Sequence, residues 1–215
     1  MGKIIVIEGI DGSGKETQSK MLVDYLNNHG YKAIEFSFPM YETPTGKIFE
    51  TCLLDKTSPS WFKEGYQNLD PELVCLYTAA DRKYNSTKIK KYLDQDYIVI
   101  LNRYTSSNMA HQGSKYDNSD DRFYMYQWID KLEYWLLKLP KPDYTILLKM
   151  PYNYLEQVSF PFQRQEENKV FKAYLELAGL YNWDKIECVK EDKIKNKEEI
   201  HKEIIALLQT KGIIK

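Results

Sequence analysis

The stretch that decides the fold follows the first apolar run and reads Glu8-Gly9-Ile10-Asp11-Gly12-Ser13-Gly14-Lys15-Glu16-Thr17. Its glycines lack a Cβ atom, so the backbone N–H groups between them can turn toward a single anion. Lys15 opens the helix that follows, and the helix N-terminus adds partial positive charge to that of the ammonium group. The spacing therefore predicts a loop that holds the phosphates of a nucleotide. Its candidate nucleotide-binding residues are Gly9, Asp11, Gly12, Ser13, Gly14, Lys15, Glu16 and Thr17.

One position of this loop departs from the usual pattern. The residue after the lysine is ordinarily Ser or Thr, whose hydroxyl binds Mg²⁺. Here Glu16 stands in that place and Thr17 follows it. Both are candidate Mg²⁺ ligands. The alternative is that Glu16 points to solvent and only stabilises the helix start, where an acidic side chain is favourable.

The rest of the chain alternates apolar runs with segments of helical spacing. Strands are predicted over residues 4–7, 33–38, 97–101 and 144–148, with a weaker fifth over 186–189. The runs are almost continuously apolar, as expected of parallel strands covered on both faces. Helices are predicted before Gly30, around residues 73–80, over 121–139 and from residue 200 to Gly212. This alternation predicts an α/β fold with a parallel sheet.

Length and composition exclude several classes of protein. The chain has 215 residues, which suits a single domain over residues 1–215, and its formal net charge is -1 at pH 7. A nucleic-acid partner is therefore not expected, because such proteins usually carry a basic surface. No apolar run approaches the ~20 residues that cross a membrane. The chain starts directly with a strand rather than a signal peptide, and its three separated cysteines fit buried thiols in a reducing cytoplasm.

Further segments resemble the thymidylate kinase family, over nearly the whole chain and in the family's order. The most specific is Asn102-Arg103-Tyr104-Thr105-Ser106-Ser107-Asn108-Met109-Ala110-His111-Gln112-Gly113, similar to the family's Asp-Arg-Tyr motif and the residues after it. Ala79-Ala80-Asp81-Arg82 is similar to the helix that supplies a base-contacting arginine, and Phe38-Pro39 also fits. The resemblance implies a three-layer P-loop kinase fold: a five-stranded parallel sheet with helices on both faces and a short lid over about residues 154–168. It also implies a homodimer that phosphorylates dTMP to dTDP with ATP and Mg²⁺.

The resemblance implies a role for each matching residue. Asp11 would lie near the sugar and the acceptor phosphate, and Lys15 would hold the transferring phosphoryl group. Arg103 would bridge the donor and acceptor phosphates, for which a planar guanidinium fork is well suited. Arg164 in the lid is the candidate for a further catalytic cation. The substrate-binding residues would be Asp11, Phe38, Arg82, Arg103, Ser107, Asn108, His111 and Gln112.

Three departures leave alternatives open. Asn102 replaces the aspartate of the Asp-Arg motif, Thr78 stands where a phenylalanine stacks on thymine, and Met40-Tyr41 replaces an arginine site. Thr78 and His111 favour a related kinase for another deoxynucleotide or a nucleoside. Glu16 and Asn102 favour a nucleotide-binding paralogue with weak catalysis. Since both should face the same phosphate and metal region, a third hypothesis is that the negative charge has moved from one position to the other.

Overall fold

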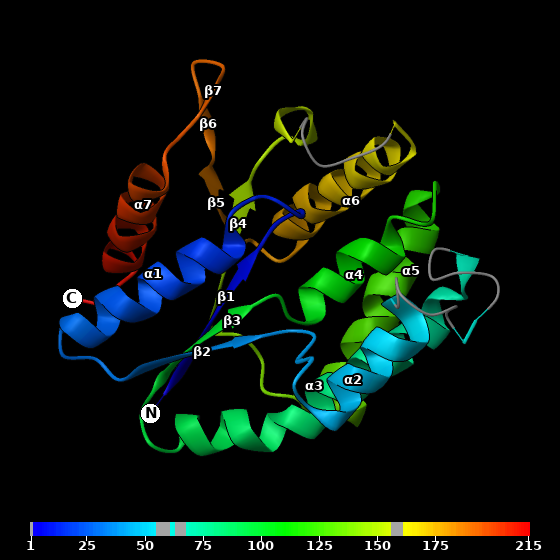
Figure 1. Cartoon of the computed structure of the whole chain (residues 1–215), viewed down its shortest axis with the longest axis horizontal. Helices are drawn as coiled ribbons and strands as arrows, with labels where there is room; N and C mark the ends of the chain where they lie inside the picture. The colour runs from blue at the N-terminus through cyan, green and yellow to red at the C-terminus, as the bar shows by residue number, and fades with distance from the viewer. Residues whose placement is uncertain (1, 55–60, 63–67, 156–160) are drawn as a thin grey trace.

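The computed structural model describes residues 2–54, 61–62, 68–155 and 161–215. A parallel five-stranded sheet in the order β2-β3-β1-β4-β5 forms its centre (Figure 1). The strands are β1 (Lys3–Glu8), β2 (Ala33–Ser37), β3 (Ile98–Asn102), β4 (Tyr144–Lys149) and β5 (Asp184–Glu187). The predicted α/β fold with a five-stranded parallel sheet is confirmed.

Helices cover both faces of this sheet and make the three layers. The long ones are α1 (Lys15–Asn28), α3 (Pro71–Leu93), α4 (Thr105–Gly113), α5 (Ser119–Asp130), α6 (Pro161–Leu180) and α7 (Lys197–Thr210). Shorter elements are α2 (Pro44–Phe49), the π-helical η1 (Glu50–Leu54) and η3 (Lys131–Leu136), the 3-10 turn η4 (Tyr152–Tyr154), and a hairpin of β6 (Val189–Lys190) and β7 (Lys193–Ile194).

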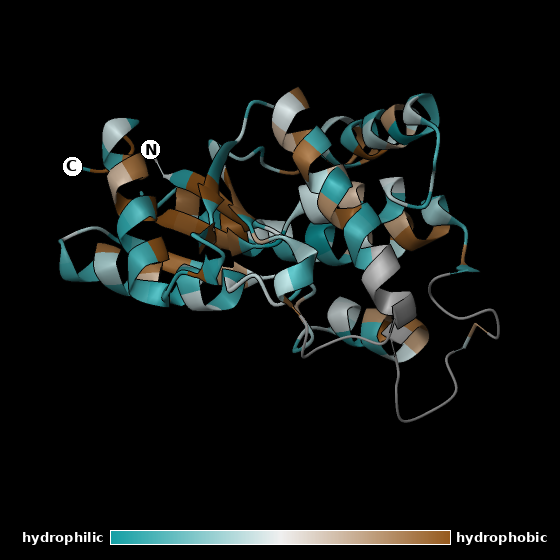
Figure 2. Cartoon of the chain, turned by 90° about the horizontal axis from the view of Figure 1, so that it is seen from above, coloured by the Kyte–Doolittle hydropathy of each residue, from teal (hydrophilic) through white to brown (hydrophobic). Residues whose placement is uncertain are grey.

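Alternate side chains of the central strands β1, β3 and β4 enter different layers of the core. Ile5 and Ile7 of β1 pack with Leu22 of α1 and Ile204 of α7 on one face. Ile4 and Val6 face the opposite side, in a cluster that includes the buried residue Ile89 of α3. A third cluster joins α4, α5 and α6 over β4. Figure 2 shows the resulting apolar strands enclosed between more polar helices. Burial on both faces is the reason that the strands read as continuous apolar runs.

Two sequence-based boundaries were wrong. The fifth strand was expected over residues 186–189, but β5 spans Asp184–Glu187 and Val189 belongs to the antiparallel hairpin. The turn of that hairpin, Glu191 and Asp192, has positive φ at both residues, as two-residue hairpin loops favour. The helix expected over 121–139 begins at Ser119, and α5 gives way at Lys131 to the π-helical η3, which ends at Leu136. Apolar spacing does not distinguish a π-helical turn from an α-helical one.

Candidate active site

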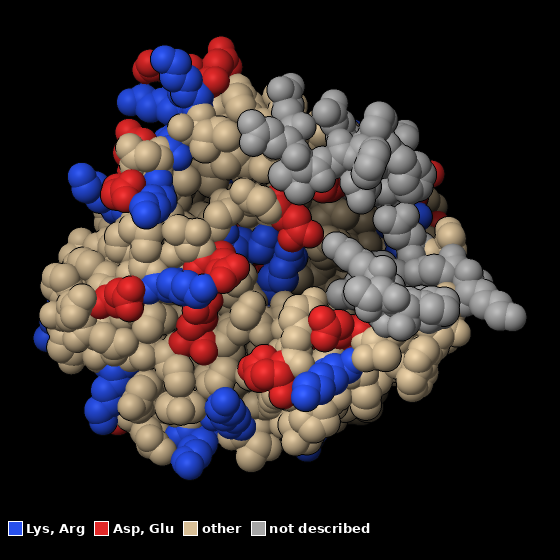
Figure 3. Space-filling model, viewed as in Figure 1, with Lys and Arg blue, Asp and Glu red and all other residues tan. Residues whose placement is uncertain are grey.

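The predicted phosphate loop lies at the carboxyl edge of the sheet, between β1 and α1, where open α/β sheets bind ligands. Gly9, Gly12 and Gly14 have φ values of 151°, 78° and 88°. A Cβ at Gly9 would also come within 2.6 Å of the Ser13 hydroxyl and 2.9 Å of the Leu148 carbonyl. The glycines are therefore required by the backbone of the loop. Figure 3 shows basic side chains on the floor of a hollow in the middle of this face, with acidic side chains beside them.

Lys15 is held beneath this loop. Its side chain is 6% exposed, and its ammonium group donates to the Ile10 carbonyl at 2.7 Å and lies 3.9 Å from the Asp11 carboxylate. Burial, reinforced by the charge of Arg103, lowers the pKa of Lys15 to about 7. A phosphate group bound in the loop would offset both effects and favour the charged ammonium.

Arg103 reaches the loop from the end of β3. Its backbone is in the left-handed region, with φ at 65°, and its N–H donates to the Ile7 carbonyl of β1 at 3.2 Å. The guanidinium pairs with Asp11 through Nη2, while Nη1 contacts Ser107 at 3.5 Å and His111 Nε2 at 3.4 Å. Burial opposes ionisation of Asp11, but the charges of Arg103 and Lys15 outweigh it and lower the pKa of this carboxyl. Burial and the Arg103 charge lower the pKa of His111 to about 4, which leaves the imidazole neutral at physiological pH.

A cavity of about 870 Å³ opens beside the phosphate loop and extends to β2. Glu16 and Asn102 both line it, which confirms that these two positions face the same region. The Glu16 side chain is 70% exposed and pairs with Lys20 at 2.5 Å. Asn102 is buried, and its Oδ1 atom has no hydrogen-bond partner among the described residues. Thr17 also lines this cavity and is exposed.

A second cavity, of about 290 Å³, adjoins the first and is referred to here as the base cavity. All eight predicted substrate-binding residues line it: Asp11, Phe38, Arg82, Arg103, Ser107, Asn108, His111 and Gln112. Thr78 lines it too, and Phe49 supplies a further aromatic ring. Tyr77 does not; its ring packs edge-on against Phe62, 6.0 Å away. The structure thus brings the predicted residues together, and their roles stay predictions.

Three buried carboxylates that the sequence did not predict as site residues fix the segments and side chains that line these two cavities. Glu8, which is fully buried, accepts hydrogen bonds from the Tyr104 N–H and from the hydroxyls of Ser106, Ser107 and Tyr174, so it ties the start of α4 to β1. Asp81 accepts from the Met40 N–H at 2.9 Å and fixes the loop after β2.

Glu133 of η3 accepts hydrogen bonds from both Nε and Nη2 of Arg82, at 2.6 and 2.5 Å. Glu8 and Asp81 lie inside motifs noted in the sequence, whereas nothing near Glu133 marks it.

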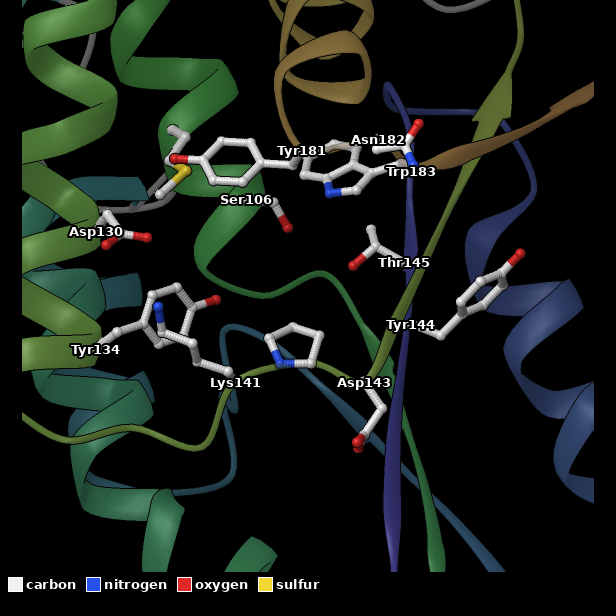
Figure 4. Close-up of a pocket in the computed structure, with 12 residues that line it drawn as sticks. Ser106, Asp130, Tyr134, Lys141, Asp143, Tyr144, Thr145, Tyr181, Asn182 and Trp183 are labelled. Atoms are coloured by element: carbon white, nitrogen blue, oxygen red, sulfur yellow. The ribbon is translucent and has the colours of Figure 1, made fainter. Parts of the chain in front are cut away.

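A further cavity, of about 240 Å³, lies on the other side of the α4 start (Figure 4). Tyr134 and Lys141 stand on one side of it and Thr145 of β4 on the other, with Trp183 above. No residue of the phosphate loop lines it. It is therefore separate from the two cavities that meet at Asp11 and Arg103.

The lid predicted over residues 154–168 is described only in part, and from residue 161 onward it forms the first turns of α6 rather than a loop. Residues 156–160 are not described, and for Arg164 the description is limited to its backbone, in the first turns of α6. The proposed role of Arg164 as a catalytic cation therefore stays a prediction.

The sequence and the fold were compared with those of known proteins. The thymidylate kinase family model matches residues 7–204. A probable thymidylate kinase of Thermococcus kodakarensis is 32% identical over 96% of this chain and 97% of its own length. The thymidylate kinase of Schizosaccharomyces pombe is 28% identical over 99% and 94%. A solved structure of thymidylate kinase from Candida albicans superposes with a TM-score of 0.73 at 25% identity, covering 98% of this chain and 92% of the other. The chain therefore belongs to the thymidylate kinase family of phosphotransferases.

Proposed function

We propose that this protein transfers the γ-phosphoryl group of ATP to the phosphate of dTMP, giving ADP and dTDP. The observation that carries this proposal is that Asp11 and Arg103 line both the phosphate-loop cavity and the base cavity. A donor triphosphate in the first and an acceptor nucleotide in the second would bring their phosphates together at these two residues.

The residues at this junction suit phosphoryl transfer. An oxygen of the acceptor phosphate attacks the γ-phosphorus, and the bond from that phosphorus to the bridging oxygen of ADP breaks. The reaction needs positioned reactants and cations against the phosphate oxygens more than covalent help from the protein. Lys15 would hold the transferring group, and Arg103 would contact both phosphates. Asp11 would orient Arg103 in the free protein and lie near the sugar of the acceptor.

The residues around the loop also fit a Mg²⁺ ion. Mg²⁺ is usually bound by one or two carboxylates together with substrate phosphates and waters. Within the described ranges no group of three or more His, Cys, Asp or Glu side chains could hold a metal, so the protein would supply few ligands. Glu16 and Thr17 would be those ligands, and binding of the ion would break the Glu16–Lys20 ion pair. The ion, when bound, would neutralise phosphate charge.

A second candidate is a kinase with another preferred deoxynucleotide. It is favoured by Thr78, which places no aromatic ring at its position in the base cavity. The Candida albicans relative is described as having broad substrate specificity. Phe49 also lines the cavity and offers an aromatic ring to a base, so Thr78 alone does not argue against dTMP, which remains the proposed acceptor.

A homodimer is proposed as the assembly, in the cytoplasm. Large apolar side chains are exposed on α3 and on the neighbouring α5 and η3: Leu76, Tyr84, Phe123, Tyr124, Trp135 and Leu136. α3 and η3 lie side by side, since Lys83 of α3 donates at 2.7 Å to the carbonyl of Leu137, the residue directly after η3. Sedimentation should give twice the mass of the chain.

Over the described residues, no helix combines the length and apolar character needed to cross a membrane.

The reaction is tested by following products. Protein incubated with ATP, Mg²⁺ and dTMP should form dTDP and ADP in equal amounts, and neither should form at a comparable rate without dTMP. ATP binding without acceptor-dependent ADP release would instead identify a nucleotide-binding protein with weak catalysis.

A further inference from the structure

We propose that Glu133 sets which atoms of the base cavity donate and which accept hydrogen bonds, and thereby selects pyrimidines with a 4-carbonyl over those with a 4-amino group. This inference rests on the proposed function. It assigns Glu133 as a positioning residue, since it acts through Arg82 and Asn108 and does not itself line the cavity.

Glu133 fixes the orientation of the Arg82 guanidinium. Its carboxylate, which is 0% exposed, accepts Nε at 2.6 Å and Nη2 at 2.5 Å, and Nη2 also donates to the Thr78 hydroxyl at 3.0 Å. Nη1 has no partner within the described part of the chain, and Arg82 lines the base cavity. Burial alone would lower the pKa of Arg82, but the Glu133 charge holds it above its usual value. Arg82 therefore presents a hydrogen-bond donor that cannot become an acceptor.

The same carboxylate fixes the orientation of the Asn108 amide. Asn108 Nδ2 lies 3.5 Å from Glu133 Oε1, and because a carboxylate only accepts, this contact assigns the NH₂ end of the amide to Glu133. The other end, Oδ1, is buried and without a partner among the residues described. A buried acceptor left unpaired is unfavourable, so this atom is poised for a donor on a ligand in the cavity that Asn108 lines.

The resulting pair of a donor at Arg82 and an acceptor at Asn108 matches one class of pyrimidine. Thymine and uracil carry an acceptor at O4 and a donor at N3–H. Cytosine carries the reverse pattern, a donor at its 4-amino group and an acceptor at N3. A cytosine in the same place would set donor against donor and acceptor against acceptor, and mismatched buried polar groups of this kind give large discrimination.

Glu133 is itself held by a third donor. The Thr105 hydroxyl donates to Oε2 at 2.7 Å, and Thr105 does not line the base cavity.

A similar arginine–glutamate pair elsewhere in the chain serves as a control. Glu176 accepts hydrogen bonds from Nε and Nη2 of Arg122, at 3.0 and 3.2 Å, and from the Tyr126 hydroxyl at 2.8 Å. Neither Arg122 nor Glu176 lines the phosphate-loop cavity or the base cavity.

The test compares Glu133→Gln with Glu176→Gln. For each, kcat/KM is measured with dTMP and dCMP, KM is measured for ATP, and equilibrium binding of both monophosphates is measured without ATP. The amide at position 133 has a single oxygen, so it cannot accept from both Nε and Nη2 of Arg82. Its NH₂ group can donate instead, which allows the Asn108 side-chain amide to rotate by 180° and exchange its donor and acceptor ends. We expect the preference for dTMP over dCMP to fall by at least about tenfold in Glu133→Gln, with KM for ATP unchanged within twofold. Glu176→Gln should keep the wild-type preference.

Two milder variants keep the proposal testable if Glu133→Gln does not fold. Glu133→Asp retains both acceptors and should retain part of the preference, and Thr105→Val should shift it in the same direction by a smaller factor. An equal loss for both monophosphates, or an unchanged ratio in every folded variant, would overturn the role of Glu133. Wild-type protein that binds dTMP more tightly than dCMP but does not phosphorylate it would refute the proposed kinase reaction and leave the role of Glu133 to the binding ratios.

Discussion

The guanidinium of Arg103 pairs with the carboxylate of Asp11, 92 positions away in the sequence, at the point where the phosphate-loop cavity and the base cavity meet. The pair joins the loop after β1 to the residue after the neighbouring strand β3, and the Arg103 backbone adopts a φ of 65° there. Incoming phosphates would replace Asp11 as the partner of this cation.

Arg103→Lys tests whether a planar fork is needed at this junction. A lysine keeps the charge but cannot contact two phosphates with parallel N–H groups. We expect kcat to fall by about 10²–10³-fold, the usual effect of removing one preorganised donor to the transition state. Arg122→Lys, which changes a paired arginine outside both cavities, should stay within twofold of the wild type. Equal activity of Arg103→Lys and wild type would show that Arg103 does not contact the reacting phosphates.

The low pKa of Lys15, about 7, predicts that ATP binding takes up a proton. In the free protein at pH 8 most of the Lys15 side chains are neutral, whereas the phosphate-bound state favours the charged ammonium. Calorimetry at pH 8 in two buffers of different ionisation enthalpy should show uptake close to one proton per ATP, falling to about half a proton near pH 7 and toward zero below it. Lys15→Arg stays protonated throughout and should abolish the uptake. Absence of uptake by the wild-type protein at pH 8 would contradict the lowered pKa.

The positions of Tyr77 and Thr78 predict that only the residue at position 78 affects dTMP binding in the base cavity. Tyr77 packs against Phe62 away from the cavity, so Tyr77→Ala should lower the melting temperature and leave KM for dTMP within twofold. Thr78 lines the cavity, and Thr78→Phe should tighten dTMP binding by about 0.5–1.5 kcal/mol through stacking. Isothermal titration measures the affinity of both variants for dTMP, and thermal unfolding and steady-state kinetics measure the melting temperature and KM of Tyr77→Ala. A large loss of affinity in Tyr77→Ala, with no gain in Thr78→Phe, would assign the stacking role to Tyr77.

Glu16 and Asn102 line one cavity, so their coupling can be measured directly. If negative charge has moved from position 102 to position 16, Glu16→Thr and Asn102→Asp should each lower kcat/KM, and the double variant should recover much of it. Each variant is titrated with Mg²⁺. Lys20→Ala, which frees Glu16 from its ion pair, is the control for effects of that pair alone. Additive losses, or a fully active Glu16→Thr, would leave Glu16 as a helix-start residue paired with Lys20.

Much of the fold and part of the site could be predicted because they depend on local patterns. The strands β1, β3 and β4 are buried on both faces and read as apolar runs, and the phosphate loop is confined to consecutive residues whose glycines adopt the positive φ that its backbone requires. Arg82 was expected in the base cavity, and it is there. Its partner Glu133 is 51 positions away on a π-helical turn, where a single glutamate among aromatic residues looks like a surface charge. Only tertiary packing reveals that this carboxylate is buried and shared by Arg82, Thr105 and Asn108.

The proposed reaction is tested most directly by ADP release with ATP and Mg²⁺ over a panel of acceptors: dTMP, dUMP, dCMP, dAMP, dGMP and thymidine. We expect the highest kcat/KM with dTMP. The donor at Arg82 and the acceptor at Asn108 account for its preference over dCMP and dAMP, whereas dUMP and dGMP match the same pair and test the rest of the base cavity. Another acceptor that is phosphorylated at least tenfold better than dTMP, a difference of about 1.4 kcal/mol, would contradict the assignment.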